Sequence, residues 1–126
     1  MRLSFLLVVA LLTSSQLIAQ DYDAIKEAFR SGNASALGRM LETTVEWSVD
    51  GELSSVGRSD AENKLRTFFM ENEPQTFDIL HTGESKSDVH YCISQLGSSG
   101  GPYRITLYLR ESIGNHLIES IEIEHD

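Results

Sequence analysis

The stretch that decides the fold is residues 103–110, Tyr-Arg-Ile-Thr-Leu-Tyr-Leu-Arg, in which apolar and polar side chains largely alternate. This period of two is typical of a β-strand that buries one face and exposes the other. A shorter run with the same period follows, with Ile121 and Ile123 as its apolar residues. A turn around Gly114 and Asn115 separates the two runs, so together they predict an antiparallel hairpin near the end of the chain.

The register of this hairpin follows from its apolar faces, which must meet on one side of the sheet. A two-residue loop would set Leu107 opposite Glu122, whereas a three-residue loop over residues 113–115 sets it opposite Ile121. We therefore expect the three-residue loop. The same register brings together these pairs: Ile105 with Ile123, Arg104 with Glu124, and Thr106 with Glu122.

Four more strands are predicted upstream of the hairpin. Two of them begin at Thr44 and Glu52, on either side of Asp50-Gly51, which favours a tight turn because glycine tolerates a positive φ. The other two place these residues on one face each: Phe77, Ile79 and His81 in the first, and Val89, Tyr91 and Ile93 in the second.

Apolar residues at helical spacing predict three helices. The first contains Tyr22, Ile25 and Phe29 and ends at Ser31-Gly32-Asn33, and the second contains Leu37, Met40 and Leu41. The third opens at Ser59–Glu62, which has the pattern of a capping box. It carries four apolar residues on one face and ends before Pro74: Ala61, Leu65, Phe68 and Phe69.

Residues 1–19 have the three-part layout of a secretory signal peptide. Arg2 gives a positive start, residues 3–12 are almost all apolar, and Ala19 is a small residue at the expected cleavage site before Gln20. An apolar run of about ten residues is too short for a bilayer, which takes about 20. No cysteine near Ala19 offers an attachment point for a lipid. We therefore expect an exported, periplasmic or extracellular protein without a stable membrane anchor, with one domain over residues 20–126.

Charge and composition exclude several classes of function. The 126 residues include 10 Lys and Arg against 19 Asp and Glu, a formal net charge of -9. Nucleic acid is therefore not an expected partner, because phosphates are neutralised by clustered Lys and Arg. The 4 histidines lack metal-ligand spacing, and no motif for a cofactor is found. Cys92, the single cysteine, lies in a strand-like run, and we expect it to be buried and unpaired.

Several segments resemble a known superfamily: Phe68-Phe69 with Pro74, the run Phe77-Asp78-Ile79-Leu80-His81-Thr82-Gly83, and Gly101 with Tyr103, Arg104 and Ile105. With this order of elements, the chain resembles the nuclear transport factor 2-like superfamily, known from ketosteroid isomerase and scytalone dehydratase. More narrowly, it is similar to a family of small exported Bacteroidota-type proteins classed as a domain of unknown function. The resemblance implies an α+β, cone-like fold in which three helices from the N-terminal half pack on a curved, mostly antiparallel six-stranded sheet. It implies no settled activity.

His81 is the residue that strand parity makes most interesting, because it is predicted to face inward with Phe77 and Ile79. It is either a ligand-binding or proton-transferring histidine, or a core histidine bonded to the backbone. The resemblance implies that the enzymes of the superfamily use an inward carboxylate or Asp/His pair with tyrosine donors. That set is incomplete here, so no catalytic residue is assigned. By strand parity Tyr91 and Tyr103 are also expected to face inward, and Glu119 shares the inward parity of Ile121 and Ile123. The candidate ligand-binding residues are His81, Trp47, Phe69, Tyr91, Tyr103 and Glu119.

Three functions fit these observations. The first, which we favour, is a non-catalytic module that binds a small apolar molecule or a protein partner in or around the cone. The second is an isomerase- or dehydratase-like enzyme that transfers a proton through His81, with Tyr91, Tyr103 or Glu119 close by. The third is self-association, so the chain is expected to be either a monomer or a homodimer.

Overall fold

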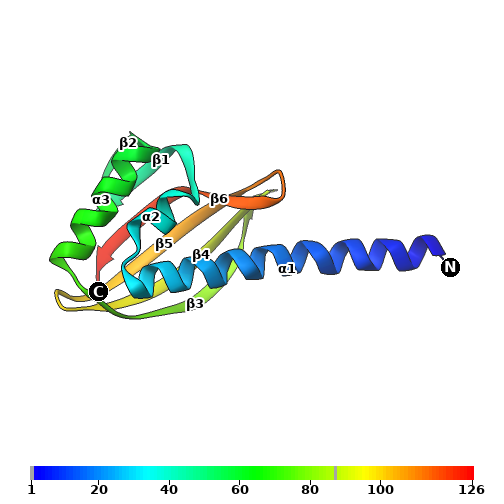
Figure 1. The fold of residues 1–126 in the computed structure, drawn as a ribbon, viewed down its shortest axis with the longest axis horizontal. Coiled ribbons are helices and arrows are strands. Elements are labelled where there is room, and N and C mark those ends of the chain that lie inside the picture. Colours follow the sequence, from blue (N-terminus) through cyan, green and yellow to red (C-terminus); the bar gives the residue numbers. More distant parts are fainter. Residues whose placement is uncertain (1, 87) are drawn as a thin grey trace.

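The computed structural model describes residues 2–86 and 88–126, with side chains from residue 17 onward. Three helices lie on one face of a curved sheet (Figure 1). The elements in chain order are α1 (Arg2–Ser31), α2 (Ala34–Gly38), β1 (Leu41–Val49), β2 (Glu52–Gly57), α3 (Arg58–Glu71), β3 (Pro74–Lys86), β4 (Val89–Ser98), β5 (Gly101–Ser112) and β6 (Asn115–His125).

The sheet has 6 strands in the order β2-β1-β6-β5-β4-β3. Its neighbours pair antiparallel, except that β1 runs parallel to β6 in the middle of the sheet. The α+β architecture and the mostly antiparallel sheet predicted from the sequence are thus confirmed. The hairpin turn is confirmed as well, because Asp50 and Gly51 both have positive φ, at 49° and 87°.

The predicted register of the last hairpin is confirmed, but the loop that was expected to produce it is not. Leu107 pairs with Ile121, and Ile105 pairs with Ile123. The loop, however, is one residue shorter than predicted, because Ser112 already pairs with Asn115. The extra residue lies instead in a β-bulge at Glu119, between the pairs Tyr108–Ser120 and Leu109–Ile118.

Two helix boundaries differ from the prediction. The second helix ends at Gly38, and Leu41 starts β1 by pairing with Ile118 of β6. The expected capping box at the third helix does not form: Gly57 is the N-cap, with no side-chain hydrogen bond. The Glu62 carboxylate that would complete the box instead binds Arg66 one turn later, at 2.9 Å.

Aromatic rings fill the space between the helices and the β3 side of the sheet. Phe29 of α1 stacks on Phe77 of β3 at 4.7 Å between ring centroids, and meets Phe69 of α3 edge-on at 5.8 Å. Cys92 is fully buried in this core and unpaired, as predicted. The interior beneath β3 and β4 is therefore packed with side chains.

Candidate functional site

The two faces of the sheet differ in character. The inner face, toward the helices, carries Trp47 and Val49 of β1, which lie level with Ile121 and Ile123 of β6. The outer face carries the polar residues of the same strands, such as Glu46 and Ser48. A ligand site within the fold must therefore lie where the inner face is left uncovered.

Such a place is a groove between α3 and the β1–β2 hairpin, with a volume of about 680 Å³. Four apolar side chains line it: Trp47, Val49, Val56 and Phe68. Five polar residues of α3 complete the lining: Asp60, Asn63, Lys64, Thr67 and Glu71. A smaller hollow of about 550 Å³ adjoins it around Trp47 and Lys64 and extends to Leu53 of β2.

The groove arises from the way α3 packs. Ala61, Leu65 and Phe69 bury one side of the helix against the core. The next stripe, Asp60, Lys64, Thr67 and Glu71, repeats at helical spacing and faces the hairpin. Because this stripe is polar, it does not close onto the apolar residues of β1, and the space between them stays open.

The back of the groove is formed by packed and hydrogen-bonded side chains. Phe68 contacts the ring of Tyr103 edge-on at 5.1 Å between centroids. The Tyr103 hydroxyl donates a buried hydrogen bond of 2.9 Å to Oδ1 of Asn72, just beyond the end of α3. Tyr103 and Phe69 are thus inward, as predicted, but they support the groove from behind and do not line it.

His81 lies on the outer face, so its predicted inward orientation is wrong. Ile79 pairs with Ser94 on the inner face, whereas His81 pairs with Ile93, which leaves Leu80 as an extra residue in β3. This bulge reverses the side-chain parity after Ile79, and the His81 imidazole is exposed.

Tyr91 also lies on the outer face, so its predicted inward orientation is wrong as well. The buried side of β4 is formed by Cys92, Ser94 and Leu96. The Tyr91 hydroxyl lies 3.2 Å from Nε2 of His81, and its ring lies over Gly83, where an added Cβ would come within 2.6 Å of the hydroxyl. His81 and Tyr91 therefore meet each other, but on the side of the sheet opposite to Tyr103.

Glu119 is the third corrected residue. The bulge in β6 turns its side chain toward Arg110, and Nε of Arg110 donates a hydrogen bond of 2.9 Å to the carboxylate. Glu119 therefore does not face the interior. Of the six candidate residues, only Trp47 lines the groove.

Sequence reasoning missed two Asp–His contacts, at the two ends of β6. Asp21 of α1 accepts hydrogen bonds from the backbone N–H of His116 at 3.0 Å and from its Nδ1 at 2.8 Å. Asp50 accepts the same two bonds from His125, at 2.9 Å and 2.7 Å. The backbone N–H of His125, followed by its imidazole, lowers the pKa of Asp50. Both contacts join β6 to distant segments, so sequence spacing gave no signal for them.

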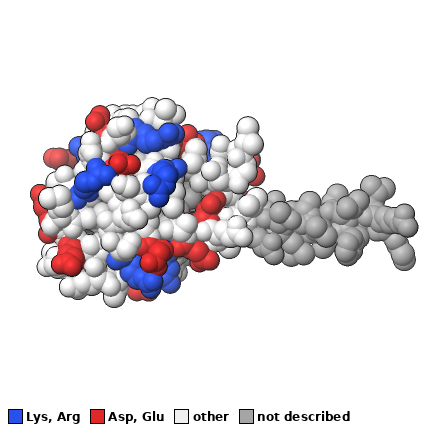
Figure 2. All heavy atoms as spheres, viewed as in Figure 1, with Lys and Arg blue, Asp and Glu red and all other residues white. Residues whose placement is uncertain are grey.

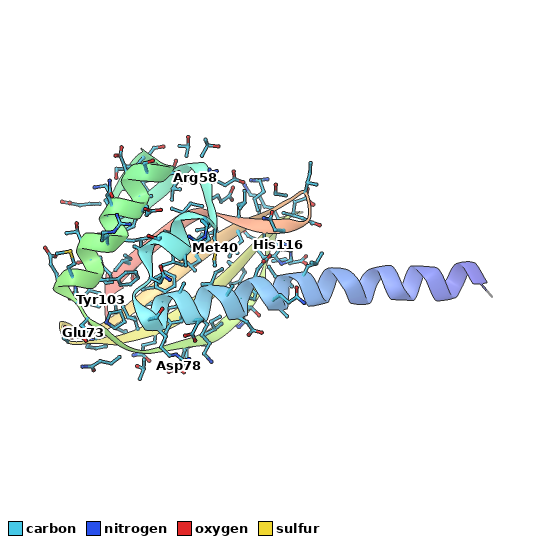
Figure 3. The ribbon with its side chains drawn as sticks, in the orientation of Figure 1. Met40, Arg58, Glu73, Asp78, Tyr103 and His116 are labelled. Carbon is cyan, nitrogen blue, oxygen red and sulfur yellow. The ribbon has the colours of Figure 1, made fainter. Side chains whose placement is uncertain are left out.

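Two kinds of feature are absent from the part of the chain whose side chains are described. Among residues with described side chains, no three or more His, Cys, Asp or Glu are placed to hold a metal ion. Within the same part of the chain, no helix is long and apolar enough to cross a membrane. Figure 3 shows that Tyr103, behind the groove, and His116 lie at opposite ends of the sheet.

Comparisons with known proteins identify relatives of the fold. Residues 22–124 match the family model described as a domain of unknown function, DUF4783. The crystal structure of a DUF4783 protein from Bacteroides fragilis superposes with a TM-score of 0.78 and 30% identity, over 82% of this chain and 96% of that one. A DUF4783 protein from Bacteroides ovatus gives 0.78 and 22%, over 82% and 93%.

More distant structures share the fold alone. A protein of the NTF2-like family from Streptomyces avermitilis has a TM-score of 0.66 and 15% identity, over 90% of this chain and 96% of that one. A de novo designed protein with a curved β-sheet gives 0.71 and 15%, over 86% and 99%. No curated protein matches the sequence significantly. The predicted nuclear transport factor 2-like fold is thereby confirmed.

Proposed function

Because this chain belongs to the DUF4783 family, a domain of unknown function with the nuclear transport factor 2-like fold, we propose a function from the site itself. The protein is a binding module that holds a small, largely apolar molecule in the groove between α3 and the β1–β2 hairpin. The ligand lies against Trp47 and Phe68, with its polar end at the rim of α3.

The observation that carries the proposal is the composition of the groove. Apolar side chains from two strands and a helix converge there, and an indole and a phenyl ring are among them. Small-molecule sites typically measure about 300–1,000 Å³ and combine an apolar lining with a few polar groups. The groove, at about 680 Å³, falls in this size range, and its apolar wall of four side chains faces the five polar residues of α3.

The proton-transfer alternative has less support. It requires His81 to share a point in a cavity with Tyr91, Tyr103 or Glu119, at the reach of a proton transfer. His81 is exposed on the outer face and meets only Tyr91 of these three. Binding is therefore the better proposal for this fold.

We also propose that the protein acts outside the cytoplasm. The signal-peptide pattern of residues 1–19 supports this location. The match to the DUF4783 family begins at residue 22, just after the expected cleavage site.

A groove-filling substitution tests the proposal. Thr67 is exposed on α3 and lines the groove, so Thr67→Phe adds an aromatic ring where the ligand would lie. A library of small apolar and amphipathic molecules is screened by the rise in Tm of the wild-type protein. We expect Thr67→Phe to reduce the affinity of the hits by about tenfold or more, which corresponds to about 1.4 kcal/mol.

The matched control is Met70→Phe, which introduces the same ring on the same helix. Met70 is 80% exposed and lies outside the groove lining. We expect it to leave the affinity unchanged. Equal loss in both variants, or hits that bind Thr67→Phe as well as they bind the wild type, would overturn the proposal.

A further inference from the structure

The side of α3 turned away from the groove carries a group of positive side chains. Arg58 and Arg66 are exposed there, one helical turn before and one after Glu62. Arg39 is also exposed; it caps the C-terminus of α2 and follows Gly38, which lies against the Glu62 carboxylate. We refer to these three arginines as the arginine patch. Figure 2 shows Lys and Arg side chains gathered around an acidic one on the face that α2 and α3 form. This concentration contrasts with the formal net charge of -9 for the whole chain.

Arg66 is held in place by three partners. Its guanidinium donates hydrogen bonds to Glu62 at 2.9 Å, to Asn63 at 2.8 Å, and to Ser35 of α2 at 3.3 Å. Gly38 makes room for this arrangement, since an added Cβ would lie 1.8 Å from Oε1 of Glu62. The charges of Arg66 and Glu62 compensate each other.

Arg58 is fixed through only one of its nitrogens. Its Nε donates a hydrogen bond of 3.0 Å to the backbone carbonyl of Leu41, which orients the guanidinium at the first residue of α3 (Figure 3). Leu41 is two residues beyond Arg39, so the two arginines lie at the same end of the patch. Among the described residues, neither Arg39 nor Arg58 forms an ion pair.

The patch therefore presents two uncompensated positive charges at one end and a compensated pair at the other. The Debye length is about 8 Å at physiological ionic strength, so a group bound on the patch is influenced mainly by the arginines. A broad anionic surface, such as a membrane, would also meet the Glu62 carboxylate and a chain whose formal net charge is -9. The charge distribution thus favours a narrow anionic partner.

The dimensions of the patch favour a chain over a single ion. Arg58 and Arg66 are eight residues apart on α3, which spans about 12 Å at 1.5 Å per residue. An extended peptide covers that distance in about four residues, with alternate side chains on the same side. Met70, one turn beyond Arg66 and 80% exposed, continues the row with an apolar contact.

We propose that the arginine patch is a docking site for an extended acidic segment of a partner protein. Carboxylates at alternate positions of the segment bind Arg39 and Arg58, and an apolar residue beyond them contacts Met70. Arginine suits this role because its planar guanidinium binds a carboxylate through two parallel hydrogen bonds. The site lies on the opposite side of α3 from the groove, so this inference does not depend on the proposed ligand.

The probe for the test is a fluorescently labelled peptide, Glu-Ser-Glu-Ser-Ser-Ser-Ser-Ser-Leu, compared with Gln-Ser-Gln-Ser-Ser-Ser-Ser-Ser-Leu. Both acidic residues and the leucine then lie on one side of the extended chain, and the leucine is far enough from them to reach Met70. Binding to the protein is measured by anisotropy at about 0.05 M and 0.15 M salt, because exposed ion pairs weaken as salt rises. Arg39→Gln is the most direct test, because the Arg39 side chain forms no hydrogen bond or ion pair with other described residues that the substitution would remove. We expect it, and Arg58→Gln, to weaken binding of the acidic peptide by about two- to fivefold.

Two further variants distinguish peptide binding at the arginine patch from a general effect of the net charge of the protein. Lys64→Gln makes the same change of charge on the groove side of α3, and we expect it to leave binding unchanged. Glu62→Gln removes the acidic group of the patch, and we expect tighter binding. Equal weakening by Lys64→Gln and Arg39→Gln, or equal binding of the two peptides, would overturn the proposal. So would inorganic phosphate that displaces the peptide at equal concentration, or binding to anionic vesicles but not to the peptide.

Discussion

At the level of single residues, burial sets the chemistry of Cys92. Its side chain is fully buried, and burial raises the pKa of the thiol to about 12. Because the thiolate is the reactive form, we expect native protein to resist iodoacetamide at about pH 8, whereas unfolded protein reacts. Mass spectrometry of the alkylated protein measures this directly. Native Cys92 that reacts as fast as the unfolded thiol would show that the core around β4 opens readily.

The contact between Asp50 and His125 makes stability depend on pH. Hydrogen bonds from His125 lower the pKa of Asp50 in the folded protein. A lowered folded-state pKa stabilises the protein above the unfolded-state pKa of about 3.9, and this stabilisation is lost as the pH falls through the folded-state pKa. We expect Asp50→Asn to lower the Tm near neutral pH. We also expect the Tm of this variant to fall less steeply than that of the wild type as the pH decreases into the acid range.

The control for Asp50 is Asp88→Asn. Both aspartates have positive φ, 49° and 68°, a conformation that Asn adopts readily. Within the described chain, Asp88 has no side-chain hydrogen bond, so we expect its substitution to leave the Tm near neutral pH little changed. Parallel Tm-versus-pH curves for the wild type and Asp50→Asn would contradict the account.

At the level of elements, the capping residue of α2 stabilises a short helix. Oδ1 of Asn33 accepts a hydrogen bond of 3.0 Å from the backbone N–H of Ala36. We expect Asn33→Ala to lower the free energy of unfolding by about 1 kcal/mol, since that is the usual contribution of an N-cap. Asn33→Asp keeps an acceptor and should retain most of the stability. Urea denaturation of the three proteins measures the difference, and an unchanged Asn33→Ala would contradict this role.

The strands were predictable, and their bulges were not. The alternation of Tyr103 to Arg110 fixed the buried face of β5 and the register against Ile121. A β-bulge adds one residue without a compositional mark, so the parity of every residue beyond it is reversed. That is why His81, beyond the bulge at Leu80, and Glu119, within the second bulge, were assigned to the wrong face.

The groove was only partly predictable for a related reason. Trp47 follows from strand parity, because β1 has no bulge between it and Val49. The opposite wall comes from α3, whose polar stripe has the spacing Asp60, Lys64, Thr67 and Glu71. That stripe was visible in the sequence but was indistinguishable from a solvent-exposed helix face. The hairpin that faces it is brought there by the parallel pairing of β1 with β6, which no local pattern indicates.

At the level of the whole molecule, the proposed export is testable through the leader. We expect the mature protein to begin at Gln20 and to be recovered outside the cytoplasm of the expressing bacterium. Leu7→Arg places a charge in the apolar run of the leader and should leave the chain uncleaved in the cytoplasm. Met70→Arg makes the same change of charge on the surface of the domain and should not affect export. N-terminal sequencing checks both, and an N-terminus at Met1 in exported protein would contradict the expectation.

The function of the whole molecule, in this account, depends on the groove beside α3. Trp47 is the single tryptophan of the chain and lies in the wall of that groove, so its fluorescence reports on the site. The most direct measurement is a titration of wild-type protein with a small molecule that raises its Tm. We predict a saturable change in Trp47 emission with the same Kd as the thermal stabilisation. Stabilising ligands that leave the Trp47 emission unchanged would show that they bind elsewhere and would contradict the central claim.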